Sequence, residues 1–136
     1  LRYRHSIWRA ADPAAPLPLI CAARLRLTRA PVEELQQAAQ HGQEYRRRTQ
    51  PRGPSAGSVF KNPPGDYAGR LIDQCGLKGT RLGGAIISPL HANWIINDTE
   101  RATAQEIIEL AELARAAVEA CFGVTLQMEQ QPIGEW

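Results

Sequence analysis

The side chains best suited to chemistry lie in one short stretch, Gly57 to Pro63. It holds a hydroxyl at Ser58, an ammonium group at Lys61 and a carboxamide at Asn62, framed by residues that favour a bend. Because Gly57 has no Cβ, a ligand could approach the Ser58 hydroxyl closely. The stretch therefore suits binding or proton transfer, although each of these residue types is more often structural when it is considered in isolation.

Two other kinds of catalytic site find no support. Ser58 lacks the Gly-x-Ser-x-Gly turn that exposes a hydrolase nucleophile. The three histidines have no metal-site spacing, so we expect His91, like the others, to be a surface or hydrogen-bonding residue. The three cysteines are far apart and form no Cys-x-x-Cys pair, which favours reduced thiols.

Length and composition indicate one domain, or one small domain with a piece of another. The chain has 136 residues, 43% of them hydrophobic. Its net charge of +2 is uneven: residues 1–52 carry ten arginines and four acids (+6), whereas residues 53–136 carry six basic and ten acidic residues (−4). No apolar run reaches the roughly 18 residues of a membrane span, and we expect a cytoplasmic protein without a membrane partner.

The first part of the chain predicts two elements and a boundary. Residues 19–28 end in an alternation of leucine and arginine that is typical of a strand with one wet side. Pro31 precedes a helix expected from Val32 to about Tyr45, whose narrow apolar face predicts a peripheral position. Residues 51–58 are rich in Pro, Gly and Ser, which is typical of a linker, and they coincide with the change in charge.

The second part alternates short strands with helices. Brief β-prone runs occur at 59–60, 85–88 and 94–97. A short helix is expected over 67–75, with Asp66 as a possible N-cap and Gly76 beyond its end.

The last helix and strand have the clearest local signals. Thr103 and Glu106 form a capping box before a helix that Gly123 should end. In residues 124–129 apolar and polar side chains alternate, so a strand would bury one set and place Glu129 on the opposite, polar side.

Taken together, several of these segments resemble the UDP-N-acetylenolpyruvoylglucosamine reductase family, the FAD enzymes that complete UDP-N-acetylmuramic acid for bacterial peptidoglycan. Nearly the whole chain takes part in the likeness. The matching segments are Tyr-Arg-His-Ser-Ile at 3–7, Gln-Pro at 50–51, Gly-Ser-Val-Phe-Lys-Asn-Pro at 57–63, Ala-Gly-Arg-Leu-Ile at 68–72, Gly-Leu-Lys-Gly at 76–79, Gly-Gly-Ala at 83–85, His-Ala-Asn at 91–93 and Phe-Gly-Val-Thr-Leu-Gln-Met-Glu at 122–129.

The resemblance implies an α+β fold in two parts. Residues 1–50 would be the tail of the FAD-binding domain, and residues 51–58 the linker. Residues 59–136 would be a small α/β domain that binds the UDP-sugar substrate, with a mixed sheet and two main helices. The family's glycine-rich flavin-contacting segments precede the matching region, so the chain is expected to be a fragment that is inactive alone, with its cofactor-binding residues unassigned.

The resemblance also implies the chemistry. With FAD and NADPH as cofactors, the enzyme reduces UDP-N-acetylglucosamine enolpyruvate. Negative charge then develops beside the substrate carboxylate, where cations and hydrogen-bond donors are needed. By resemblance, Arg4 pairs with that carboxylate, Glu129 hydrogen-bonds it, and Ser58 donates a proton to the carbanion-like carbon.

Four further residues would bind substrate by resemblance. Lys61 and Asn62 correspond to positions near the nucleotide sugar, and Tyr3 to one near the substrate. Thr49 stands where the family commonly has a phosphate-contacting lysine, so Arg48 or its neighbour Arg47 would have to reach the diphosphate.

Two alternatives from other classes remain. The domain could be a non-catalytic module that binds a UDP-sugar or a partner. It could also bind nucleic acid through the triplet at 46–48, but without interleaved aromatic residues such a triplet more often marks an exposed helix end, so we expect no nucleic-acid partner. We expect the chain to be a monomer.

Overall fold

The computed structural model describes residues 19–134, and its contacts separate residues 1–35 from residues 36–136. In the described part of the first unit, residues 19–31 have no helix or strand and are exposed. The strand expected at 19–28 is therefore wrong. A strand needs a neighbour for its backbone hydrogen bonds, and no described residue pairs with this segment.

Helix α1 (Val32–Thr49) begins where it was predicted and runs one turn further. None of its side chains is buried, which confirms its exposed character. Glu33 and Glu34 lie in its first turn and three arginines, 46–48, in its last turn, so both ends carry charges that oppose the helix dipole. The charges at both ends therefore favour the helix.

The sheet consists of β1 (Arg81–Leu82), β2 (Ala85–Ile87) and β3 (Ile95–Asn97), in the order β1-β2-β3. Both pairings are antiparallel, where a mixed sheet was expected. The connections explain the direction, because a two-residue turn joins β1 to β2 and a short loop joins β2 to β3, and neither is long enough for a parallel crossover.

Two more segments extend this sheet without forming full strands. Residues 54–58 run beside β3, where the Asn97 N–H donates to the Pro54 carbonyl at 2.9 Å and Ser58 forms a bridge with Trp94. On the other side, Phe60 forms a bridge with Met128. The stretch expected to be a linker is thus partly paired with the sheet.

The short helix α2 (Ala68–Gln74) has Tyr67 at its N-cap, with no side-chain cap bond. The Asp66 carboxylate accepts instead from the Tyr67 N–H at 2.6 Å, so the predicted Asp66 cap is wrong by one residue. The Asn62 Oδ1 accepts from the Ala68 N–H at 3.1 Å and so satisfies the first amide of the helix.

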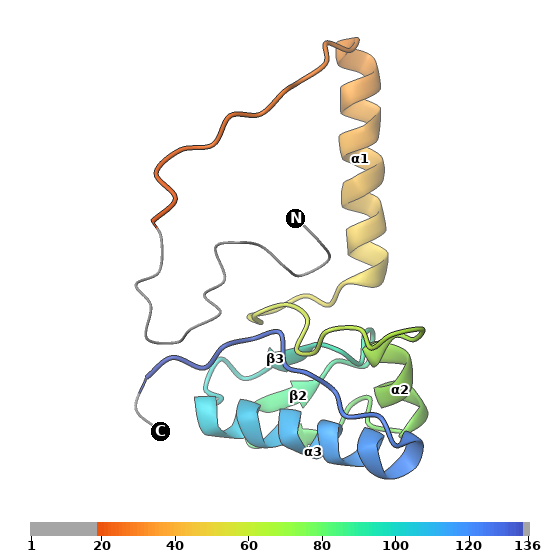
Figure 1. Cartoon of the computed structure of the whole chain (residues 1–136), viewed down its shortest axis with the longest axis vertical. Helices are drawn as coiled ribbons and strands as arrows, with labels where there is room; N and C mark the ends of the chain where they lie inside the picture. The colour runs from red at the N-terminus through yellow and green to blue at the C-terminus, as the bar shows by residue number, and fades with distance from the viewer. Residues whose placement is uncertain (1–18, 135–136) are drawn as a thin grey trace. The chain divides into compact units, whose positions relative to one another are not determined.

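The long helix α3 (Ala104–Phe122) has the predicted signals at both ends. Thr103 and Glu106 form the capping box, and Gly123 ends the helix with φ of 66°. In Figure 1, α3 lies along the sheet with α2 near one end of it. Among the described residues, no helix is both long and apolar enough to cross a membrane.

The core lies between the sheet and these two helices. Its largest fully buried side chains are Val59, Phe60, Leu71, Ile72, Ile87, Leu110 and Val118. In the last segment Leu126 is buried, and Val124 and Met128 are partly buried against the core. The alternation predicted for residues 124–129 is therefore confirmed from Val124 to Met128 but not at Glu129, and the segment forms an isolated bridge rather than a full strand.

Candidate functional site

The loop between β2 and β3, residues 88–94, is fixed by a buried hydroxyl. Ser88 is fully buried, and its Oγ accepts from the N–H groups of Leu90 at 3.1 Å and His91 at 3.2 Å. A serine that accepts from the amides two and three residues ahead of it closes a local turn. The loop backbone therefore has a defined path, which fixes the position from which the His91 side chain projects.

The buried side chain of Asn93 ties this loop to the segment that carries Ser58. Its Oδ1 accepts from the Phe60 N–H at 2.9 Å, and its Nδ2 donates to the Phe60 carbonyl at 2.8 Å. The Val59 N–H also donates to the Asn93 carbonyl at 2.9 Å. One asparagine thus acts as a strand neighbour for Phe60 and sets the position of Ser58, two residues before it.

Helix α2 packs closely against the same loop because Gly69 has no side chain. A Cβ at Gly69 would lie 3.0 Å from Cε1 of His91 and 3.6 Å from Cβ of Asn93. A larger residue would have to push the His91 ring away or move the helix.

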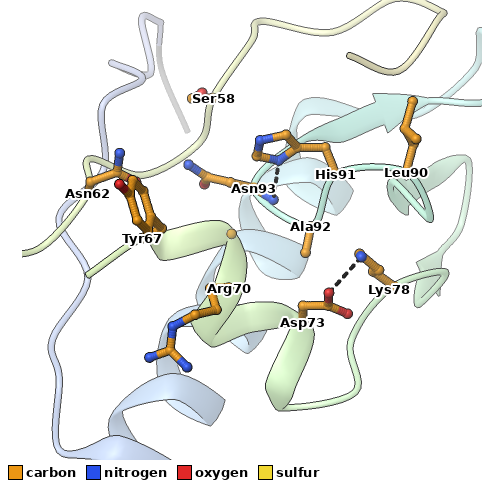
Figure 2. A pocket seen from close by; sticks show the side chains of 11 residues that line it. Ser58, Asn62, Tyr67, Arg70, Asp73, Lys78, Leu90, His91, Ala92 and Asn93 are labelled. Carbon is orange, nitrogen blue, oxygen red and sulfur yellow. Dashed lines mark hydrogen bonds and ion pairs between the residues drawn. The ribbon is translucent and has the colours of Figure 1, made fainter. Parts of the chain in front are cut away.

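A polar cavity of about 400 Å³ lies where these elements meet. In Figure 2, Ser58 and Asn62 lie towards one end of the group that lines it, Leu90 and Lys78 towards the other, and Asn93 and His91 between them. The lining residues are Ser58, Asn62, Tyr67, Gly69, Arg70, Asp73, Lys78, Leu90, His91, Ala92 and Asn93.

The charged residues of the cavity wall are paired. Arg70 binds the carboxylate of Asp66, and this hydrogen bond is the main reason that the pKa of Asp66 falls to about 2. The Lys78 Nζ lies 2.6 Å from Oδ2 of Asp73. The ion pairs supply both donors and acceptors to a ligand while leaving little net charge in the wall.

His91 presents a neutral ring to the cavity. Its Nδ1 accepts from the Asn93 N–H at 3.2 Å, which assigns the ring proton to Nε2. Burial is the main cause that lowers the pKa of His91, and nearby Lys78 lowers it further. At neutral pH, the ring can therefore donate one hydrogen bond from Nε2.

Ser58 and Asn62 are the predicted site residues that line the cavity together. Lys61 and Glu129 lie on paired backbone beside them but are not among its lining residues. The Lys61 N–H donates to the Gln127 carbonyl at 2.9 Å, and the Glu129 N–H donates to the Val59 carbonyl at 2.8 Å. Glu129 is half-buried and its Oε2 is buried, whereas the sequence placed it on a polar, exposed side.

The structure does not place the other predicted residues at the cavity. Arg48 is exposed in the last turn of α1 and does not line it. Tyr3 and Arg4 lie outside the described residues. The convergence of Arg4 with Ser58 and Glu129 therefore remains a prediction.

Sequence reasoning missed most of the cavity wall. Tyr67, Arg70, Asp73 and Lys78 come from α2 and the turns around it, and none of them was among the predicted site residues. His91 was expected to be a surface or hydrogen-bonding residue, and its Nδ1 does accept a hydrogen bond, but its place in the cavity was not foreseen. The available signal was the resemblance, which includes residues 68–72, 76–79 and 91–93, but the pattern of these runs alone carries no recognisable chemistry.

The arrangement suits binding of a polar organic ligand. It offers a hydroxyl, carboxamides, a neutral imidazole and two ion pairs within one concave site. Among residues 19–134, no three His, Cys, Asp or Glu side chains are grouped as a metal site.

An antiparallel sheet covered by α3, with a polar cavity beside α2, defines a small α+β domain with a candidate ligand site. The family model for "UDP-N-acetylenolpyruvoylglucosamine reductase, C-terminal domain" matches residues 49–133. The chain belongs to this family.

Relatives and a solved structure agree with this assignment. UDP-N-acetylenolpyruvoylglucosamine reductase of Chloroflexus aggregans is 50% identical over 131 residues, which is 96% of this chain and 44% of that protein. Reductase 2 of Symbiobacterium thermophilum is 58% identical over 85 residues, 62% of this chain and 27% of that protein. The crystal structure of the Thermus caldophilus reductase has a TM-score of 0.67 and 41% identity, covering 79% of this chain and 38% of that one. The chain thus spans less than half the length of these relatives.

Proposed function

We propose that this chain is the substrate-binding part of a reductase that converts UDP-N-acetylglucosamine enolpyruvate to UDP-N-acetylmuramate. The reaction serves peptidoglycan precursor synthesis in the cytoplasm and uses NADPH and FAD. Family membership supports the reaction class. The observation that carries the assignment to this domain is that Ser58 and Asn62, predicted for proton donation and nucleotide-sugar binding, line one polar cavity.

The cofactors are assigned to no described residue. A dinucleotide phosphate commonly binds at a helix N-terminus with free N–H groups. Here Asn62 occupies the first amide of α2, while Thr103 and Glu106 cap α3, so neither end fits a flavin diphosphate. FAD reduced by NADPH would supply the hydride, and the residues of this chain would handle the substrate and the proton.

Ser58 is the proposed proton donor. Ser58 lines the cavity on a backbone held on one side by Asn93 and on the other by the segment of Glu129. A serine hydroxyl is a weak acid, but a carbanion-like carbon is a far stronger base than water, so no histidine or aspartate partner is needed. Arg4 and Glu129 are the proposed partners of the substrate carboxylate.

Asn62 is the proposed contact to the nucleotide sugar, together with Tyr3, Lys61 and Arg48. The Asn62 Oδ1 is engaged by α2, which leaves its Nδ2 as the donor for a ligand. The same bond fixes the direction of the amide. The paired charges of the wall and the Nε2–H of His91 then favour hydrogen bonding over simple charge attraction.

The direct test restores a complete enzyme. The matching C-terminal region of the Chloroflexus aggregans reductase is replaced with this chain, and the two half-reactions are followed through the flavin absorbance. We expect the chimera to be active. Its Ser58→Ala variant should reduce flavin with NADPH normally but reoxidise it with substrate at least ~100-fold more slowly, as for loss of a general acid.

Two results would count against the proposal. A Ser58→Ala chimera with both half-reactions at full rate would remove the proton-donor role. A folded but inactive chimera in which the chain still binds UDP saturably would favour the non-catalytic binding module. An active chimera would exclude that alternative. Ser55→Ala, an exposed serine that does not line the cavity, is the matched control.

A further inference from the structure

The backbone around Ser58 is held by two neighbouring segments. On the side of β3, the Val59 N–H donates to the Asn93 carbonyl at 2.9 Å. On the side of the C-terminal segment, the Glu129 N–H donates to the Val59 carbonyl at 2.8 Å. Both of these hydrogen bonds fix the residue that follows Ser58 in the chain.

The residue before Ser58 is held by a side chain. The Gln130 Nε2 donates to the Gly57 carbonyl at 3.3 Å, across 73 positions of the sequence. Both residues are half-buried, so water competes only in part for this hydrogen bond. The bond therefore orients the peptide group that joins Gly57 to Ser58.

The conformation of Gly57 makes this restraint important. Its φ is 81°, in the left-handed region that glycine adopts readily, and no heavy atom of the described residues beyond its chain neighbours lies within 4 Å of a Cβ built there. Packing on this side does not hold the backbone, and glycine has more backbone freedom than other residues. The hydrogen bond from Gln130 is therefore a restraint that the glycine itself does not provide.

Gln130 also joins two parts of the proposed site. It directly follows Glu129, the proposed partner of the substrate carboxylate, and its side chain reaches the residue before Ser58, the proposed proton donor. The hydrogen bond from the Glu129 N–H to Val59 sets the register of this C-terminal segment. The side chain of Gln130 therefore contributes to the placement of Ser58 relative to Glu129.

We propose that Gln130 is a positioning residue, which holds Ser58 in place for proton transfer through the Gly57 carbonyl. This inference rests on the proposed function of Ser58. A proton donor must come within roughly 2.6 to 3.2 Å of its acceptor, and a displacement of about 1 Å can slow an enzyme about 100-fold. In this role Gln130 affects the rate of the second half-reaction and not the affinity for the substrate.

The kinetic test uses the same chimera and its Gln130→Met variant, in which a side chain of similar size lacks the donor. We expect NADPH to reduce the flavin at the normal rate and the substrate to bind with unchanged affinity. Reoxidation of the flavin by substrate should slow at least ~10-fold. Gln131→Met changes the exposed neighbouring glutamine, so this matched control should leave all three quantities unchanged.

A double-mutant cycle separates the positioning of Ser58 from a general structural role. If Gln130 acts through the Ser58 hydroxyl, Gln130→Met should change the reoxidation rate less than ~2-fold once Ser58 is replaced by alanine. An equal loss in both backgrounds would show that Gln130 acts elsewhere and would overturn the inference.

NMR spectroscopy of the 136-residue chain tests the geometry without the reaction. We expect Gln130→Met to shift the amide signals of Gly57 and Ser58 and to lower the backbone order parameter of Ser58, whereas Gln131→Met should change neither. An unchanged Ser58 order parameter in Gln130→Met would overturn this inference and leave the proposed function intact. Reoxidation at full rate in Ser58→Ala would instead remove the proton-donor role, and this inference with it.

Discussion

Asn93 holds both backbone polar groups of Phe60, donating to its carbonyl at 2.8 Å and accepting from its N–H at 2.9 Å. Both residues are buried, with exposed fractions of 4% and 2%, so water cannot replace either bond. The sheet therefore continues from β3 to the Ser58 segment partly through a side chain. Stability and placement of the site depend on the same amide.

Asn93→Ala should lower the free energy of unfolding by roughly 2 to 5 kcal/mol, because two buried backbone groups each lose a partner. Urea denaturation measures the change. The control is Asn97→Ala, which removes one bond, from the Ala102 N–H to Oδ1 at 2.9 Å, at a half-buried position. That variant should lose about 1 kcal/mol. Equal losses in the two variants would show that the Phe60 bonds add nothing.

Local signals predicted the helices well and the strands poorly. The capping box of Thr103 and Glu106 and the terminating Gly123 involve neighbours in sequence, so their pattern is sufficient to place α3. A strand depends on its partner. Residues 19–28 have a strand pattern but no partner among the described residues, whereas residues 54–58 have a linker composition and lie beside β3.

The site follows the same rule. Ser58 and Asn62 were found because they share one short stretch that matches the family. The opposite wall comes from α2 and from the loop of Ser88 to Asn93, and tertiary contacts alone bring them to Ser58. Gly69 shows most clearly what the local sequence cannot predict. A larger residue at this position would contact His91, which lies on another element.

Gly83→Ala should test how the β1–β2 turn and the start of α3 are joined. A Cβ at Gly83 would overlap the carboxylate of Glu106, and the φ of 54° at Gly83 is unfavourable for alanine. The Glu106 Oε2 accepts from the N–H groups of Gly84 at 3.2 Å and Thr103 at 3.0 Å, and these bonds lower the pKa of Glu106 below its ordinary 4.5. We expect the substitution to cost more than the ~1 to 2 kcal/mol of a left-handed alanine and to raise that pKa in an NMR titration.

Gly123→Ala is the matched control for this turn. Its φ of 66° imposes a similar backbone cost, but no heavy atom lies within 4 Å of the added Cβ. It should therefore lose only about 1 to 2 kcal/mol and leave the titration of Glu106 unchanged. If both variants behaved alike, the contact of Gly83 with Glu106 would have no energetic consequence.

The ion pair between Asp66 and Arg70 predicts a stability change at low pH. The folded pKa of Asp66 is about 2, against an ordinary value of 3.8. A lowered carboxyl pKa means that the unfolded chain binds the proton more readily, so the stabilisation is present above pH 3.8 and disappears as the pH falls towards 2. The difference in unfolding free energy between wild type and Asp66→Asn should shrink across this window.

An NMR titration of the Asp66 carboxyl separates the cause from other acid effects. Arg70 is the largest contributor to the low value. Arg70→Gln should therefore bring the pKa of Asp66 back towards 3.8, while the chain stays folded at neutral pH. An unchanged titration in that variant would contradict the assignment.

Gly69→Ala should separate the shape of the cavity from the stability of α2. Alanine favours a helix over glycine by up to ~1 kcal/mol, but here its Cβ would lie 3.0 Å from Cε1 of His91 and 3.4 Å from Nδ1. The ring must move, which disturbs its bond from the Asn93 N–H. We expect little change in unfolding free energy but about a tenfold loss of UDP affinity, equal to about 1.4 kcal/mol, measured by calorimetry.

Gly42→Ala in α1, with no atom within 4 Å of the added Cβ, should raise the helical circular dichroism signal and leave UDP affinity unchanged. Full UDP affinity in Gly69→Ala would show that this part of the cavity does not bind the nucleotide.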